Sequence, residues 1–261
     1  MGATEGDMAE SKRDWARLVT RAALILGVGA VAAALLAAIG SATELWTFRA
    51  GLTALRYLFF AAAAGALLGL IGLVMARRRA RLMLANLVAL VVALGFVLYL
   101  GNLVRIAKSV PAIHDVATDL DEAPQFSRLK VRADNLENVP DEGRAELKAL
   151  APEERWKAIH RTHYGDIRTL RLPTPPGQAL QRAAALARER GWEVALAEGD
   201  RVEATATSTF FRFKDDVVVR IRPAPNGGSL VDMRSISRVG GSDVGMNAKR
   251  IRAFLADLQG G

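Results

Sequence analysis

Apolar residues are concentrated in the first 108 positions of the chain, in three long runs that contain no charged residue. Each run is about 20 residues long, which is the length that an α-helix needs to cross the ~30 Å hydrocarbon core of a bilayer. None carries the polar stripe of a helix that packs on a soluble core. The pattern predicts three transmembrane helices, at about 18–40, 54–76 and 82–105.

Beyond residue 108 the pattern changes to short alternating segments and amphipathic helices. A helix is expected over 174–191, since prolines stand at its start and Gly191 at its end. Four strand-like runs follow, at 192–198, 201–211, 213–223 and 229–239. A last helix is expected over 243–258. This order predicts a small α+β domain, a four-stranded antiparallel sheet with helices covering one face.

The pattern also sets the expected domain limits. Residues 1–107 would hold a cytoplasmic tail and the three helices, and residues 108–261 the extracytoplasmic α+β domain. The segment that leads into this domain, residues 110–126 (the lead-in), is expected to be extended and ordered. An insertion is expected at about 127–165, and its charged stretch 140–163 reads as two short surface helices or a partly mobile segment.

Basic residues predict the orientation in the membrane. Four arginines crowd the turn between the second and third helices, at positions 77, 78, 79 and 81, and four basic residues precede the first helix. Because Lys and Arg are enriched on the cytoplasmic side, the N-terminus is expected inside and the domain after residue 107 outside. In a Gram-negative cell this is a multi-pass inner-membrane protein with a periplasmic domain. The absence of cysteine is compatible with that location.

The formal net charge of +8 is unevenly distributed. Residues up to 107 carry a balance of +6, and the remainder only +2. The basic character is therefore largely a signal of membrane topology. Without a concentrated basic patch, nucleic-acid binding lacks its electrostatic basis, and no nucleic-acid partner is expected.

Several stretches resemble one known family. They are IHDVATDLDEAPQF, GWEV, EATATSTFFRFKDDVVVRI and, above all, DMRSISRVGGSDVGMNAKRIRAFL. These stretches are similar to the "domain of unknown function 1499" family over about residues 110–260. The resemblance implies a domain of the cell envelope or of an organelle lumen, here fused to a membrane anchor, and it implies no activity.

Alternation with period two places the charged residues of the last two strands on one face. Pairing across the turn at 223–228 puts Arg220 opposite Asp232 or one pair away, and Asp216 within a diagonal of Arg234 or Arg238. Two interpretations stay open. The residues form a structural charge ladder on the open face of the sheet, or a shallow groove that binds a charged ligand.

The start of the last helix carries further polar residues. Ser242 or Asp243 can cap it, its free amides can attract an anion, and Asn247 can bond back to the lead-in. The candidate ligand-binding residues are Arg220, Asp232, Arg234, Arg238, Asp243 and Asn247. Asp215 falls on the apolar face and needs a partner, for which His114, Lys249 and a backbone amide are candidates.

No metal or cofactor is expected. The acidic lead-in around His114 lacks the spacing of a calcium loop, and His160, His163 and Asp166 offer too few ligands for zinc. The chain has no cysteine, and no serine or glycine-rich loop matches a nucleophile or nucleotide motif.

The apolar runs contain no Asp, Glu, Lys or His, which disfavours coupled transport and leaves the lipid bilayer as their partner. The leading hypothesis is a non-enzymatic binding domain displayed in the envelope, for an envelope component or a partner protein. The first alternative is an envelope hydrolase of glycans or lipids that uses Asp216 or Asp243 as acid or base. The second is an assembly factor whose helices carry the function.

Overall fold

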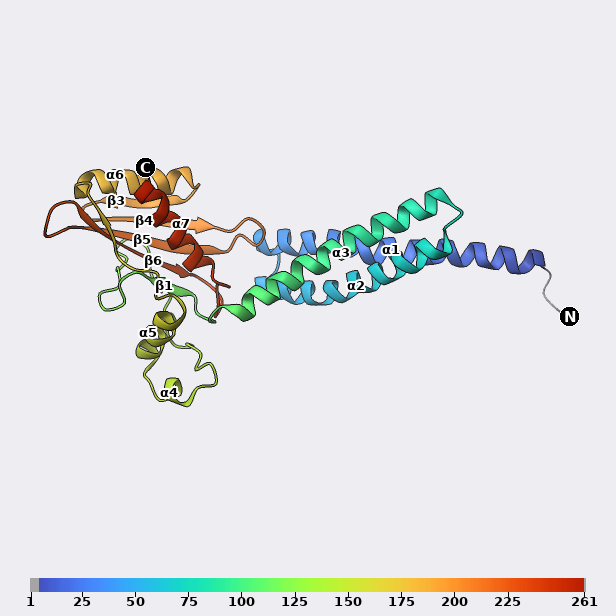
Figure 1. Ribbon diagram of the computed structural model, residues 1–261, viewed down its shortest axis with the longest axis horizontal. Helices are drawn as coiled ribbons and strands as arrows, with labels where there is room; N and C mark the ends of the chain where they lie inside the picture. Colours follow the sequence, from blue (N-terminus) through green and yellow to red (C-terminus); the bar gives the residue numbers. More distant parts are fainter. Residues whose placement is uncertain (1–4, 261) are drawn as a thin grey trace. The chain divides into compact units, whose positions relative to one another are not determined.

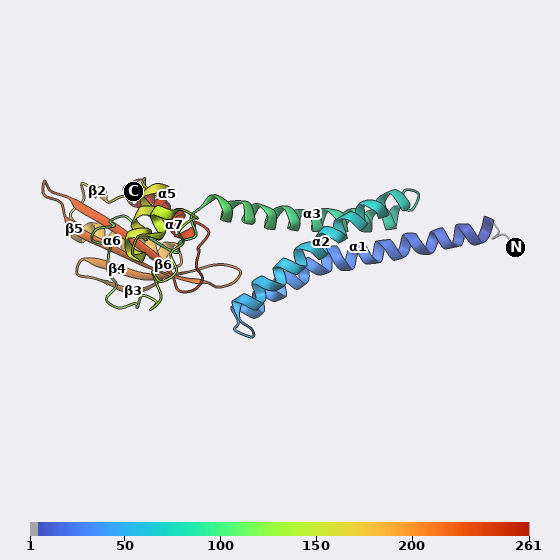
Figure 2. The same cartoon turned by 90° about the horizontal axis from the view of Figure 1, so that it is seen from below.

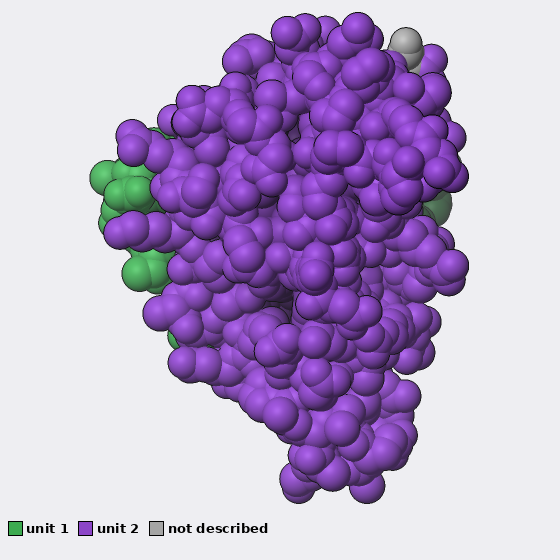
Figure 3. Space-filling model, turned by 90° about the vertical axis from the view of Figure 1, so that its left-hand side faces the viewer, with its two compact units in different colours: residues 1–105 green, residues 106–261 purple. Residues whose placement is uncertain are grey.

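The computed structural model describes residues 5–260 of the chain, with side chains from residue 15 onward. The chain divides into two compact units, Met1–Arg105 and Ile106–Gly261, which Figure 3 shows in different colours.

The first unit consists of three long helices. They are α1 (Glu5–Ala42), α2 (Phe48–Met75) and α3 (Ala80–Ser109), seen in Figure 1. Within the described residues, three segments are long and apolar enough to cross a membrane: Trp15–Ala42, Phe48–Met75 and Ala80–Ser109. The prediction of three long apolar helices is confirmed.

Small residues let these helices approach closely. Every buried residue of α2 is glycine or alanine. A Cβ added at Gly65 would overlap the backbone of Gly27 in α1, and one added at Gly72 would overlap the Asn86 side chain of α3. Asn86 Nδ2 also donates to Thr20 Oγ1 of α1 at 2.9 Å. The bundle is thus held by close backbone packing around one buried polar contact.

The second unit is built on one antiparallel sheet. Its strands are β1 (Asp115–Ala117), β2 (Leu170–Leu172), β3 (Glu193–Glu198), β4 (Arg201–Thr207), β5 (Lys214–Pro223) and β6 (Ser229–Ser237). The order is β1-β6-β5-β4-β3, and β2 pairs with the other half of β6 along the same edge as β1 (Figures 1 and 2). The four predicted strands are β3 to β6, but the sheet has six strands, so the predicted number is wrong. Strands of three residues carry no alternation that a sequence pattern can detect.

Two helices cover one face of the sheet, as predicted. They are α6 (Pro176–Glu189) and α7 (Met246–Gly260). Val219 and Met233 of the sheet share a buried core with Ile251 and Phe254 of α7. Helix α7 begins after Gly245, later than expected, because Val244 and Gly245 have positive φ angles, which a right-handed helix excludes. The short helices α4 (Ala145–Lys148) and α5 (Pro152–His163) lie in the expected insertion.

The opposite face carries the charged residues and is not open. Glu203 and Asp232 are fully buried, and Asp216 and Arg234 are 4% and 7% exposed. The segment between β1 and α4 bonds to three of these residues. Backbone amides of residues 127–129 donate to Glu203, the Thr118 hydroxyl donates to Asp232, and the Pro124 carbonyl accepts from Arg234. The expectation of an open sheet face is wrong, because this segment folds back over the polar face and supplies hydrogen-bond partners to it.

Candidate functional site

Arg220 and Asp232 lie directly opposite each other in the pairing of β5 with β6, as predicted. Arg220 Nη2 donates to Asp232 Oδ2 at 3.0 Å, and Arg222 Nη2 donates to the same oxygen at 2.8 Å. The hydroxyls of Thr118 and Thr169 donate to Asp232 Oδ1. Burial alone would raise the pKa of Asp232, but the hydrogen bonds from Thr169 and the two arginines hold it below its usual value.

Arg234 forms its ion pair with Asp115 of β1. Its Nε and Nη2 donate to the two carboxylate oxygens at 3.0 and 2.7 Å. Asn135 Nδ2 donates to the same carboxylate at 2.6 Å, and Trp156 Nε1 donates to the Asp115 carbonyl at 2.8 Å. Sequence reasoning placed Asp115 in the lead-in and did not pair it with Arg234, because β1 is too short to be recognised.

Arg238 and Asp216 form the predicted diagonal pair. Arg238 Nε and Nη2 donate to Asp216 Oδ2 and Oδ1, both at 2.8 Å. Thr205 Oγ1 donates to Asp216 Oδ1 at 2.8 Å and accepts from Arg238 Nη2 at 3.0 Å. Both oxygens of Asp216 are therefore engaged inside the domain.

Glu203 is the member of this face that sequence reasoning missed. Its carboxylate accepts from Ser127 Oγ and from the amides of Ser127, Arg128 and Leu129, at 2.5–2.9 Å. Burial alone would raise the pKa of Glu203, but these hydrogen bonds hold it below its usual value. Alternation in EATAT, with Glu203 and Thr205 against Val202 and Ala204, is the signal that could have placed it there.

Asp243 and Asn247 lie away from this network, at the start of α7. Asp243 accepts from the amides of Gly245 and Asn247, at 2.9 and 2.5 Å, and burial raises the pKa of its carboxyl group. Asn247 is fully buried, and its Nδ2 donates to the His114 carbonyl at 2.9 Å. The bond from Asn247 to the lead-in is confirmed, and both residues hold the helix start in place.

Asp215, the neighbour of Asp216, lies on the helix-covered face. Its Oδ2 accepts from Arg250 Nη2 of α7 at 2.5 Å. None of the partners proposed from the sequence, His114, Lys249 or a backbone amide, fills this role. The reason is that Arg250 lies three residues beyond Asn247, so one turn of α7 presents both side chains to the sheet.

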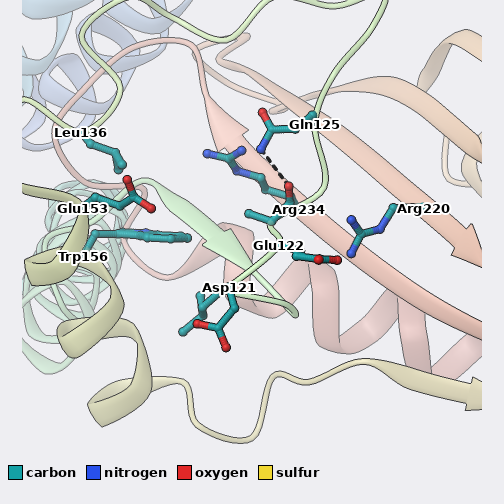
Figure 4. A pocket seen from close by; sticks show the side chains of 10 residues that line it. Asp121, Glu122, Gln125, Leu136, Glu153, Trp156, Arg220 and Arg234 are labelled. Carbon is teal, nitrogen blue, oxygen red and sulfur yellow. Dashed lines mark hydrogen bonds between the residues drawn. The ribbon is translucent and has the colours of Figure 1, made fainter.

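A pocket with a volume of about 420 Å³ lies over the polar face of the sheet (Figure 4). Arg220 and Arg234 reach it from β5 and β6, and Trp156 and Glu153 reach it from α5. The segment between β1 and α4 supplies the rest of its wall: Leu120, Asp121, Glu122, Ala123, Gln125 and Leu136. Of the six candidate residues, Arg220 and Arg234 therefore line one cavity, while Asp232 binds Arg220 and the other three lie elsewhere.

A family model described as "Protein of unknown function (DUF1499)" matches residues 115–258, which is more than half of the chain. The chain belongs to the DUF1499 family. The match begins at the first residue of β1 and ends within α7, so the DUF1499 domain includes all six strands and the buried network. Searches of the curated proteins and of the solved structures found no match.

The pocket of the DUF1499 domain has a neutralised floor and an acidic rim. Asp115 pairs with Arg234, and Asp119 and Asp232 pair with Arg220, whose buried Nε has no hydrogen-bond partner. At the rim, the side chains of Asp121, Glu122 and Glu153 are 83%, 72% and 64% exposed, and they pair with Arg161, Arg222 and Lys157 respectively. The pocket therefore offers guanidinium donors below and carboxylate acceptors above, without excess positive charge to attract an anion.

A second hollow of about 660 Å³ shares Leu120 and Asp121 with the first. His160 lines this hollow, and burial lowers its pKa to about 4. Its Nε2 accepts from the Ala117 amide at 3.3 Å, so the ring is neutral. His163, by contrast, pairs with Glu142.

The three residues considered for a zinc site, His160, His163 and Asp166, are held by different partners. Asp166 pairs with Arg252 of α7. Among the side chains of residues 15–260, no group of three or more His, Asp or Glu is arranged to hold a metal ion.

Proposed function

We propose that this chain is a multi-pass protein of the inner membrane whose DUF1499 domain lies in the periplasm and binds an envelope component without transforming it. The orientation rests on the basic residues of the N-terminal region and of the turn between α2 and α3, where Arg77 and Arg78 are exposed. The binding role rests on the pocket over Arg220 and Arg234.

The chemistry of this pocket favours an uncharged or amine-bearing polyhydroxyl compound, of which an envelope glycan is the natural example. Its volume of about 420 Å³ lies in the usual range for small-ligand sites. Hydroxyl groups can donate to the rim carboxylates of Asp121 and Glu153. A phosphate would meet arginines that Asp115, Asp119 and Asp232 already neutralise. The single observation that carries the proposal is this pairing of a satisfied cationic floor with an exposed acidic rim.

The alternative of an envelope hydrolase has less support. It requires Asp216 or Asp243 to reach a substrate as acid or base. Both oxygens of Asp216 accept from Arg238, and both oxygens of Asp243 accept from backbone amides. Neither residue lines the 420 Å³ pocket. The raised pKa of Asp243 follows from its burial and needs no catalytic explanation.

Binding is tested with the full chain in lipid nanodiscs, titrated with defined soluble glycans: N-acetylglucosamine oligomers, muropeptides and, for comparison, inorganic phosphate. Saturable binding of a glycan is expected, with little response to phosphate. The double variant Asp121→Asn/Glu153→Gln should weaken binding by about tenfold, the loss of one or two hydrogen bonds to charged groups. The exposed Glu146→Gln, outside the pocket, is the matched control. Absence of saturation by every glycan, or equal affinities of the two variants, would refute the binding role.

Orientation is tested separately, because the chain contains no cysteine. Asn226→Cys, in the exposed turn between β5 and β6, should react with a membrane-impermeant maleimide added to cells with permeabilised outer membranes. Arg78→Cys should react only after the inner membrane is broken. The reverse pattern of labelling would overturn the orientation and leave the binding test unaffected.

A further inference from the structure

At one end of the DUF1499 sheet, two loops lie beside the segment through which the chain enters the domain from α3. Strand pairing places Asp115 beside Ile236, and Asp215 beside Ser237. Lys214 in turn lies beside Thr207. The chain therefore enters the sheet at the end from which the β4–β5 turn and the β6–α7 loop project, as Figure 1 shows.

The β6–α7 loop is bonded to the entering chain. The Asp243 amide donates to the Ile113 carbonyl at 3.2 Å, and the Met246 amide donates to the Asp243 carbonyl at 3.2 Å. Arg132 Nη1 donates to the Gly240 carbonyl at 2.7 Å, which brings the segment around residue 132 to the same place. Three segments far apart in the sequence thus meet at this end.

Exposed apolar side chains concentrate at this end. The structure exposes five large apolar side chains within residues 110–260: Val131, Leu150, Phe210, Val239 and Met246. Phe210 belongs to the β4–β5 turn, Val239 to the β6–α7 loop and Val131 to the segment beside Arg132, and Met246 is the first residue of α7. Phe210 and Met246 are 58% and 51% exposed. Such a grouping of apolar residues on an otherwise polar domain marks an interaction surface.

The β4–β5 turn also carries positive charge. Its sequence is STFFRFK, in which Phe211 and Phe213 stack with ring centroids 5.4 Å apart. Arg212 and Lys214 are exposed, and neither forms an ion pair with any residue from 15 to 260. Aromatic rings beside free cations suit the boundary between acyl chains and anionic headgroups.

A short linker joins the DUF1499 domain to the apolar helices. Helix α3 ends at Ser109 and β1 begins at Asp115. The five residues between them bridge at most about 20 Å even when fully extended. A weak apolar contact made by a domain tethered so closely to a membrane-spanning helix would meet a high effective concentration of lipid.

We infer that this end of the DUF1499 domain is a second membrane contact, separate from the helices, in which Phe210 and its neighbours insert at the lipid interface and Arg212 and Lys214 bind anionic headgroups. The contact would orient the domain on the bilayer. It does not depend on the ligand proposed for the pocket, which lies over the face of the sheet.

The experiment uses single-cysteine variants of the full chain. Thr209→Cys labels the exposed β4–β5 turn and leaves Phe210 intact, and Asn226→Cys labels the exposed turn at the opposite end of the sheet. Each carries a nitroxide in liposomes of phosphatidylcholine, with or without phosphatidylglycerol. Electron paramagnetic resonance then compares collisions with oxygen, which partitions into lipid, and with a water-soluble nickel chelate.

In liposomes with anionic lipid, the label at 209 is expected to show a ratio of oxygen to nickel collisions several-fold above that at 226. Phe210→Ser, or Arg212→Glu with Lys214→Glu, should reduce this ratio to the value at 226. These side chains are exposed, so unchanged circular dichroism is expected and serves as the folding control.

Two results would overturn the inference. One is equal nickel access at 209 and 226 in both kinds of liposome. The other is loss of nickel collisions at 209 without any gain in oxygen collisions, which would point to a protein surface as the occupant.

Discussion

Arg234 of β6 donates two hydrogen bonds to Asp115 of β1, in an ion pair whose side chains are only 8% and 1% exposed. The pair joins the first strand of the DUF1499 domain to β6, its neighbour in the sheet. Asn135 and Trp156 bind the same aspartate, so the lead-in, the insertion and the sheet all meet there. Substitution of Arg234 tests how much this ion pair stabilises the domain.

Removing one partner of this pair should destabilise the domain strongly. Arg234→Ala leaves the Asp115 charge buried without its partner, and loss of about 3–5 kcal/mol in unfolding free energy is expected. The exposed pair of Arg252 with Asp166 provides the control, because Arg252→Ala should cost only ~0–1 kcal/mol. Urea unfolding of the full chain in detergent, followed by tryptophan fluorescence, measures both. Equal effects of the two substitutions would contradict the structural role of the buried pair.

Glu203 should hold the covering segment on the sheet. Glu203→Gln keeps the shape of the side chain but replaces one acceptor oxygen with a donor that faces backbone amides. Hydrogen exchange at residues 127–129 is therefore expected to quicken by about tenfold or more, since a hydrogen bond to a charged group contributes about 1.5–3 kcal/mol. Glu198→Gln, in an exposed part of β3, is the control and should leave exchange unchanged. Unaltered protection in both variants would mean that other contacts hold the segment.

His160 should make the stability of the domain depend on pH. Burial lowers its pKa to about 4, below the unfolded value of about 6.5, so the unfolded state takes up a proton first as pH falls. Its contribution is fully present above pH 6.5 and is lost progressively toward pH 4. The melting temperature of the wild type should fall across this window, and that of His160→Gln should fall less. A wild-type melting temperature that stays constant between pH 6.5 and 4.5 would show that His160 is not held neutral by burial.

Close packing of α1 against α2 should depend on Gly65. A methyl group there would overlap the backbone of Gly27, which cannot rotate away, and overpacking costs typically about 1–3 kcal/mol. Gly65→Ala is expected to lower the melting temperature of the detergent-solubilised chain by several degrees. Gly95→Ala is the control in α3, where an added Cβ meets nothing within 4 Å. A Gly65→Ala variant as stable as Gly95→Ala would contradict the close contact.

Sequence patterns predicted the elements whose signals are local. The three long helices follow from uninterrupted apolar runs. Helix α6 follows from prolines at its start and glycine at its end, and α7 from apolar residues at helical spacing. The strands β3 to β6 follow from alternation, and the turn at 223–228 set the register of β5 on β6. That register placed Arg220 opposite Asp232 or one pair away, and the two lie directly opposite. Local chemistry offered Ser242 or Asp243 as the helix cap, and Asp243 accepts from the amides of the helix start.

The tertiary structure decided what depends on residues far apart in the chain. Strands β1 and β2 have three residues each and exist only because the two halves of β6 accept them. Burial of the charged face depends on donors from residues 118–135, whose sequence has neither helical nor strand periodicity. Asp115 of β1 binds Arg234, while Asp216 binds Arg238. Once that segment folds back, the pocket forms in the space between segment and sheet. Alternation determines which face a side chain takes, and only long-range packing determines what covers that face.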